Sequence, residues 1–159
     1  MEEKPETTRA IVVYETKYGN TKIVAERIMQ GLKTKKGIEA DITELKNLDI
    51  KKLANYDLLI IGSPNHARSP TRGIRKFIDQ LGKLDLKKKQ FAVFDTCGGD
   101  KALGQAAKKM EENIAKKAPA LKILIPGLSV RVKGMKGPII EEDLAKCEEF
   151  GKAIASKIS

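Results

Sequence analysis

The chain has 159 residues, enough for one domain with a sizeable buried core, and its hydrophobic share of 41% excludes a disordered chain. Its formal charge of +10, from 31 Lys plus Arg against 21 Asp plus Glu, favours anionic ligands and acidic partners but says nothing about the fold. Two cysteines outside any Cys-x-x-Cys pair or Cys/His cluster argue against a zinc site and are typical of a reducing, cytoplasmic protein.

We expect the whole chain, residues 1–159, to form one domain, with residues 1–8 as a flexible N-terminal tail. This polar start lacks the apolar segment of a signal peptide, and no later apolar run has membrane-spanning length. A continuous apolar run over residues 10–14 then predicts a buried strand. The next helix ends near Gly37, and its apolar stripe consists of Val24, Ala25, Ile28, Met29 and Leu32. Residues 39–45 alternate polar and apolar, which is typical of an edge strand.

The middle of the chain repeats this order of strand and helix. Residues 58–61 are apolar throughout and predict a buried strand, which stops at the Gly-Ser-Pro sequence of residues 62–64. The helix that follows has an apolar stripe made of Ile74, Phe77, Ile78 and Leu81. Residues 91–94 predict a third buried strand, which ends shortly before the glycine pair Gly98 and Gly99.

The last part of the chain predicts two more helices around a final strand. The first of these helices is closed by Pro119, and its apolar stripe consists of Leu103, Ala106, Ala107, Met110 and Ile114. Residues 123–132 predict the last strand, and Pro126 within it favours an edge position because proline cannot donate a hydrogen bond to a neighbouring strand. The closing helix carries Leu144, Cys147, Ile154 and Ile158, which places Cys147 in the core.

This alternation predicts an α/β fold with a five-stranded parallel sheet and helices on both faces, because each crossover is a right-handed βαβ unit. The fully apolar strands belong in the centre of the sheet, and the two strands with polar or proline positions belong at its edges. These preferences give the strand order 2-1-3-4-5. A ligand is then expected outside the carboxyl ends of strands one and three, where the strand order reverses.

The segment between the first strand and the first helix has the composition of a phosphate-binding loop. It consists of Thr16, Lys17, Tyr18, Gly19, Asn20 and Thr21 and leads straight into the helix. Hydroxyl and amide side chains flank a glycine that permits a tight turn, and a helix start offers free N–H groups and a positive dipole end. The alternative is a simple helix cap by Asn20 or Thr21.

Residues 16–21 resemble the flavodoxin phosphate loop, Thr/Ser-x-Thr/Tyr-Gly-x-Thr, and the likeness covers nearly the whole chain in element order and loop placement. The chain looks like a short-chain flavodoxin and is similar to the flavodoxin modules of archaeal and anaerobic flavoproteins. The resemblance implies a flavodoxin-like fold with FMN as the cofactor. The residues implied to hold the FMN phosphate are Thr16, Tyr18, Gly19, Asn20 and Thr21.

The resemblance also assigns the two loops that follow the third and fourth strands. One edge of the flavin ring is expected against Ser63, Pro64, Asn65, His66 and Ala67. The pyrimidine edge is expected to bind backbone groups of Thr96, Cys97, Gly98, Gly99 and Asp100. His66 is then either a flavin contact or an exposed residue without a role. Cys97 either touches the flavin or is a small apolar residue of the core.

The chain departs from the flavodoxin pattern in three respects. It has no Trp, and neither ring-binding loop carries Tyr or Phe, so the aromatic sandwich of many flavodoxins is missing. Asn65 and His66 stand where many flavodoxins have a glycine whose peptide flips on reduction. The chain is strongly basic, whereas flavodoxins are usually acidic.

The function that the resemblance favours is an FMN-binding electron carrier between redox partners, because a compact chain leaves little room for a substrate pocket. The alternative is an FMN-dependent NAD(P)H:quinone-type reductase, and a flavin-free binding domain is a third class. A response regulator is excluded, because Gly62 and Ser63 stand where its phosphorylated aspartate would end the third strand. No catalytic residue and no metal site is predicted.

Redox proteins are the expected partners, and the basic charge favours acidic ones. Binding to membranes or nucleic acid is not expected, because the lysines are scattered over several helices. Two groups of lysines are candidates for a docking patch, with a solvated surface as the simpler interpretation. They consist of Lys83, Lys87, Lys88 and Lys89, and of Lys108, Lys109, Lys116 and Lys117.

Overall fold

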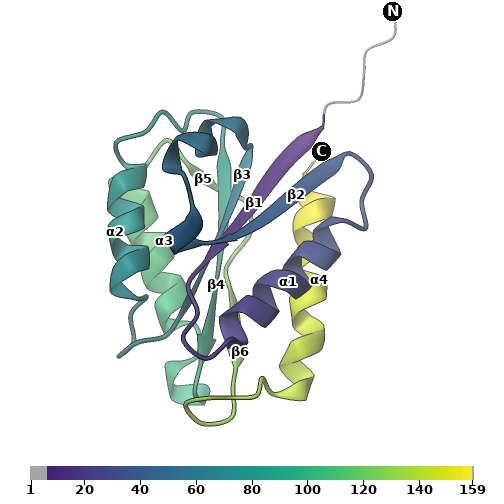
Figure 1. Ribbon diagram of the computed structural model, residues 1–159, viewed down its shortest axis with the longest axis vertical. Coiled ribbons are helices and arrows are strands. Elements are labelled where there is room, and N and C mark those ends of the chain that lie inside the picture. The colour runs from purple at the N-terminus through teal and green to yellow at the C-terminus, as the bar shows by residue number, and fades with distance from the viewer. Residues whose placement is uncertain (1–6, 159) are drawn as a thin grey trace, which may run out of the picture.

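The computed structural model describes residues 7–158, which form a parallel sheet surrounded by α-helices (Figure 1). The strands are β1 (Thr8–Tyr14), β2 (Ile38–Glu44), β3 (Leu58–Pro64), β4 (Gln90–Cys97), β5 (Lys122–Ile123) and β6 (Leu128–Arg131). The α-helices are α1 (Asn20–Leu32), α2 (Arg72–Leu81), α3 (Gln105–Lys117) and α4 (Glu141–Lys157), and short 3-10 helices cover Leu45–Asn47, Ile50–Asn55 and Asp100–Ala102. The strand order β2-β1-β3-β4-β5 confirms the predicted fold, and β6 also pairs with β4.

Helices cover both faces of the sheet, with α2 and α3 on one side and α1 and α4 on the other (Figure 1). Side chains of each central strand alternate between these two cores. In β1, Ile11 and Val13 pack beneath α2 and α3, whereas Ala10 and Val12 pack beneath α1 and α4. Because both faces are buried, the central strands are apolar runs without the alternation of a half-exposed sheet. Cys147 is fully buried in the second core, as predicted.

The predicted single strand over residues 123–132 is wrong. Two short strands occupy this region, and each pairs separately with β4. Pro126 lies between them and has no N–H to donate, and the N–H of Gly127 donates to the Glu111 carboxylate at 2.9 Å instead of to a strand. The chain therefore leaves the ladder after Ile123 and returns to it at Leu128.

Two further details differ from the sequence prediction. Leu103 is not on the buried stripe of α3, because it lies before the helix and is 48% exposed. Thr8 pairs with Ile38 in the sheet, so the predicted tail over residues 1–8 extends too far, and residues 1–6 lie outside the described part of the chain. Within residues 7–158, no helix combines the length and the apolar character needed to cross a bilayer.

The helices α1 and α4 approach each other so closely that their backbones touch. A Cβ atom added to Gly31 would lie 2.2 Å from the carbonyl oxygen of Glu148, and one added to Gly151 would lie 2.1 Å from that of Ile28. Only glycine leaves room for such a contact. This packing braces α1, whose first turn begins at the predicted phosphate loop.

We expect the substitution Gly31→Ala to lower the free energy of unfolding by about 2 kcal/mol or more, because the new methyl group meets backbone atoms that cannot move aside. Helix propensity alone predicts the opposite sign, since Gly→Ala in a helix interior stabilises by about 1 kcal/mol. Urea denaturation at neutral pH measures the change. A stabilised variant would show that α1 and α4 are not in backbone contact.

Candidate cofactor site

A cavity of about 570 Å³ opens at the carboxyl ends of the central strands, at the lower end of the molecule in Figure 1. A parallel sheet places its ligands there, beside the point where the strand order reverses. The lining residues are Thr16, Lys17, Tyr18, Asn20, Thr21, Pro64, Asn65, His66, Ala67, Thr96, Cys97, Gly98, Val132, Gly134 and Met135. The cavity has the size of a cofactor site. None of these lining residues is Asp or Glu, so the wall suits an anionic ligand.

The loop after β1 forms an anion site at the start of α1. Gly19 has φ +90°, a conformation that other residues rarely adopt, and its N–H donates to the hydroxyl of Thr16 at 3.0 Å. No side chain in the described part of the chain caps α1. The first N–H bonded within the helix is that of Ile23, which donates to the carbonyl of Gly19 at 3.2 Å. The preceding N–H groups and the helix dipole are therefore available to a phosphate.

The hydroxyls of Thr21 and Thr96 connect this helix start to the end of β4. They lie 3.0 Å apart, and both side chains are buried. One hydroxyl donates to the other, which leaves the second hydrogen free for a ligand. The contact keeps the phosphate loop in register with the loop that follows β4.

Asn65 shapes the loop after β3. Its backbone N–H donates to the carbonyl of Thr96 at 2.8 Å, and its side-chain amide donates to the carbonyl of Ala102 at 3.0 Å. Its side-chain oxygen accepts the N–H of Arg68 at 2.8 Å. A tight turn follows, in which the backbones of His66 and Ser69 exchange hydrogen bonds of 2.7 and 3.0 Å. The exposed His66 therefore lies at the mouth of the cavity, where it lines the wall.

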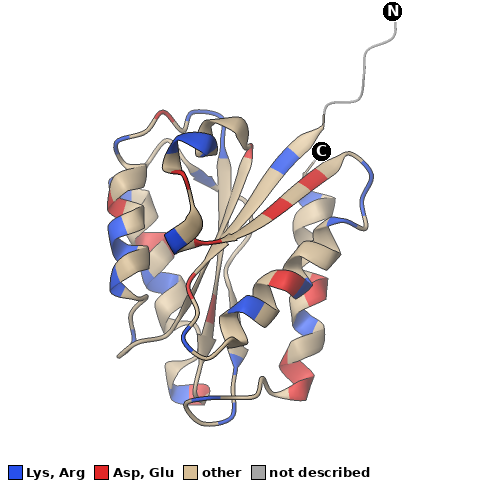
Figure 2. Cartoon of the chain, viewed as in Figure 1, with Lys and Arg blue, Asp and Glu red and all other residues tan. Residues whose placement is uncertain are grey.

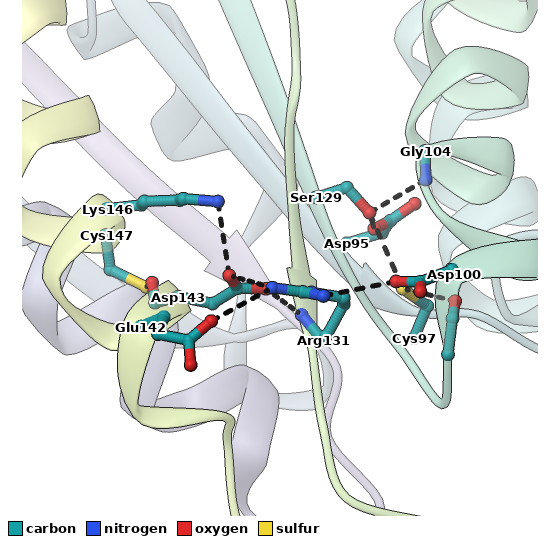
Figure 3. Close-up of polar contacts among 11 residues, drawn as sticks. Asp95, Cys97, Asp100, Gly104, Ser129, Arg131, Glu142, Asp143, Lys146 and Cys147 are labelled. Atoms are coloured by element: carbon teal, nitrogen blue, oxygen red, sulfur yellow. Dashed lines mark hydrogen bonds and ion pairs between the residues drawn. The ribbon is translucent and has the colours of Figure 1, made fainter.

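The loop after β4 contributes a buried thiol to the cavity wall. Cys97 is only 2% exposed, and its Sγ lies 3.7 Å from both the carbonyl of Gly99 and the hydroxyl of Ser129. Burial raises the pKa of the Cys97 thiol, so the group stays protonated at neutral pH and is a poor nucleophile. Ser129 in turn accepts the N–H of Gly104 at 2.8 Å and donates to the carboxylate of Asp95, which fixes this loop to β6 (Figure 3).

Four of the predicted site residues lie outside the cavity wall. Gly19 shapes the phosphate loop from behind, and Gly99 accepts the thiol contact of Cys97. Ser63 is fully buried in β3, where its hydroxyl accepts the N–H of Thr71 at 2.9 Å and donates to the carbonyl of Pro64. Asp100 is exposed and turns away to form an ion pair of 3.1 Å. The structure brings the remaining predicted residues together around one cavity.

A fourth loop, residues 133–138, was missed from the sequence. Its members Gly134 and Met135 line the cavity together with Val132, the residue before it. The carbonyl of Lys136 accepts a hydrogen bond from the side chain of Asn20 at 3.0 Å, which ties this loop to the phosphate loop. The two glycines of the segment Lys-Gly-Met-Lys-Gly-Pro were a turn signal that could have indicated it.

Arg131 holds the surroundings of the site together (Figure 3). Its guanidinium donates to both oxygens of the Asp143 carboxylate, at 2.9 and 3.0 Å, and to Asp100 at 3.1 Å. Asp143 is fully buried at the start of α4, and Lys146 adds a further contact of 3.2 Å. The Arg131 guanidinium holds the pKa of the Asp143 carboxyl well below its usual range. The network thus joins β6, the loop after β4 and α4.

Comparison with known proteins identifies the family. A family model described as a flavodoxin domain matches residues 11–132, which include the first three loops of the cavity. The chain belongs to the flavodoxin family. The oxidised flavodoxin 2 from Bacillus cereus has a similar structure, with a TM-score of 0.80 and 26% identity over 95% of this chain and 100% of the other. This confirms the resemblance carried by the phosphate loop.

Curated relatives match this chain over only part of their own length. A flavodoxin from Clostridium saccharobutylicum is 31% identical over 85 residues, which are 54% of this chain and 53% of the relative. A nitric oxide reductase from Moorella thermoacetica is 28% identical over 157 residues, which are 95% of this chain and 36% of the relative. The chain therefore spans between about a third and about half of the length of these relatives.

FMN is the cofactor of flavodoxins, and the residues of this cavity fit it. The uncapped start of α1, with the hydroxyl of Thr16, suits a terminal phosphate. The wall without carboxylates leaves an anion unopposed. The backbone of Pro64 to Ala67 and of Thr96 to Gly98 borders the rest of the cavity, where the flavin ring is predicted to lie. Tyr18 and Met135 supply large side chains at the mouth.

The pH dependence of stability tests the Arg131–Asp143 pair. The folded pKa of Asp143 lies below its unfolded value of about 3.9, so the ionised carboxylate stabilises the fold above that pH. This stabilisation is lost as the pH falls towards the folded pKa. We expect the free energy of unfolding of Asp143→Asn to decrease less between about pH 4 and pH 2 than that of the unaltered chain.

Chemical denaturation at several pH values measures this difference. Glu141→Gln is the matched control, because Glu141 lies in the same helical turn, is exposed and has no ion pair within residues 7–158. The control should follow the unaltered chain. An Asp143→Asn variant that loses stability with acid as steeply as the unaltered chain contradicts the assignment.

Proposed function

We propose that this flavodoxin is an electron carrier, in which FMN accepts electrons from one redox protein and passes them to another. The observation that carries the proposal is the exposure of the cavity mouth, where the lining side chains of Tyr18 and Met135 are 40% and 77% exposed. A cofactor that lies between them is close to the surface. Electron transfer then needs only an encounter with a partner and no pocket for a second substrate.

The rest of the structure supports a carrier. A second cavity, of about 200 Å³, is lined by Leu45, Leu48, Ile50 and Phe77 and shares no residue with the first, so it does not offer a substrate place beside FMN. A reducing, cytoplasmic setting is part of the proposal, since Cys97 and Cys147 are free and buried.

The residues of the cavity have distinct tasks in this proposal. The start of α1 binds the phosphate and so orients the cofactor, while the turn at His66 and the backbone beside Cys97 border the ring. FMN supplies the redox chemistry when it is bound. The neutral thiol of Cys97 adds no charge to the cavity wall.

We expect FMN to bind one to one and riboflavin to bind far more weakly, because riboflavin lacks the phosphate. The substitution Thr16→Ala should weaken FMN binding by about 1–3 kcal/mol, the worth of a hydrogen bond to a charged group, and leave riboflavin binding unchanged. Quenching of flavin fluorescence measures both affinities. Thr34→Ala, on an exposed hydroxyl beyond α1, is the control. Equal affinities for FMN and riboflavin would refute the phosphate site.

Oxidation of NADH or NADPH should be slow, with a turnover below roughly 1 per second, because no nicotinamide site adjoins the cavity in this proposal. A steady-state assay of the FMN-loaded protein with a quinone acceptor measures the rate. Faster turnover would favour the FMN-dependent NAD(P)H:quinone-type reductase over the carrier.

A further inference from the structure

Four basic side chains from separate segments of the chain surround the mouth of the cavity. Lys17 belongs to the phosphate loop and Lys136 to the loop 133–138, and their Nζ atoms lie 5.4 and 6.0 Å from the ring centroid of Tyr18. Arg68 is exposed in the turn after β3, and Lys109 of α3 reaches this turn, where its Nζ bonds the hydroxyl of Ser69 at 3.1 Å. We call these four residues the basic rim. Figure 2 shows Lys and Arg on the loops at this lower end of the molecule.

The charges of the basic rim are not neutralised by nearby acids. Within the described part of the chain, none of its four residues forms an ion pair, and only a few of the basic residues elsewhere do. Arg9 pairs with Glu39 at 3.7 Å, and Lys117 pairs with Asp79 at 3.8 Å. The three acids nearest in sequence to the cavity wall have other partners: Glu15 accepts the hydroxyl of Thr71, Asp95 accepts that of Ser129, and Asp100 pairs with Arg131. The rim therefore presents a positive potential at the place where the cofactor reaches the surface.

Large apolar side chains are exposed at the same place. Tyr18 and Met135 line the cavity, and Leu103 is 48% exposed beside Ala102, whose carbonyl accepts the side chain of Asn65. They are three of the five large hydrophobic side chains that are exposed among the described residues. Apolar side chains surrounded by unpaired charge are typical of a protein–protein interface, in which the apolar part is buried and the charges orient the partner.

We propose that the basic rim, together with Tyr18, Leu103 and Met135, is the docking surface for an acidic electron-transfer protein whose own redox centre is ringed by Asp and Glu. This inference rests on the proposed electron-carrier function. At each encounter one electron leaves the reduced FMN, which is oxidised, and enters the partner's centre, which is reduced. No covalent bond forms or breaks. The unpaired cations orient the partner so that the two redox centres face each other.

Other lysines of the two groups named from the sequence lie at the opposite end of the sheet. Lys83 and Lys87 are exposed in the connection that leads to the amino end of β4, and Lys116 is exposed in the last turn of α3. Lys89 is tied to the carbonyls of Ala54 and Tyr56. Replacing Lys83, Lys87 and Lys116 by Glu therefore changes the net charge as much as three such replacements at the rim. The changes at these three positions lie far from the cavity.

The experiment measures the rate at which the photoreduced, FMN-loaded protein is oxidised in a stopped-flow instrument. Two protein oxidants of opposite charge serve as probes, acidic plastocyanin and basic cytochrome c. With plastocyanin the rate should be high at low ionic strength and decrease with added salt, whereas with cytochrome c it should increase with salt. In the rim variant Arg68→Glu/Lys109→Glu/Lys136→Glu, the rate of oxidation by plastocyanin should decrease by about tenfold or more at low ionic strength. The control Lys83→Glu/Lys87→Glu/Lys116→Glu should change the rate by less than about twofold.

Absorbance of bound FMN and the flavin midpoint potential are measured first for every variant, so that rates are compared on loaded protein of known driving force. A chain that binds no FMN overturns the electron-carrier function and the docking surface together. If FMN binds but the rate of oxidation by plastocyanin falls equally in the rim and control variants, the docking surface alone is overturned. The same holds if this rate does not depend on salt. If the rim variant does not fold, Arg68→Gln/Lys109→Gln/Lys136→Gln replaces it, and an unchanged plastocyanin rate in that variant overturns the proposal equally.

Discussion

The burial of the parallel sheet on both faces is the constraint on which the rest of the structure depends. Parallel neighbours need a crossover of a dozen or more residues, and helices on both faces provide it. All strands then end at the same edge, so the loops after β1, β3 and β4 meet there although they are far apart in the sequence. The uncapped start of α1 opens into the same space. The cavity thus follows from the topology and not from any one motif.

Much of this could be predicted from the sequence, because local patterns carry it. Apolar runs identified the central strands, and residues 16–21 identified a loop that lines the cavity at the start of α1. The errors concern contacts between distant segments. No local pattern shows that β5 and β6 pair separately with β4 or that Arg131 forms an ion pair with Asp143. The loop 133–138 was missed for the same reason, since its place beside Asn20 is visible only in three dimensions.

Charge is distributed unevenly over the molecule. Some acidic side chains are engaged in ion pairs such as Lys117–Asp79 or in the buried network of Arg131, whereas the four cations of the basic rim have no ion pair within residues 7–158. Part of the net charge of +10 therefore lies where the cofactor is predicted to bind. An anionic cofactor and an acidic partner both benefit from the same surplus, the first through its phosphate and the second through long-range attraction.

The close packing of α1 against α4 has a consequence for the order of assembly during synthesis. The predicted phosphate loop follows the first strand, but α4, which braces the helix after this loop, comes after β6. Beyond the contact at Gly31 and Gly151, the ammonium of Lys35 binds the carbonyls of Ala155 and Ile158 at the far end of α4. A nascent chain halted before α4 lacks these supports. The helix that begins at the predicted phosphate loop therefore gains its full support only once α4 has packed against it.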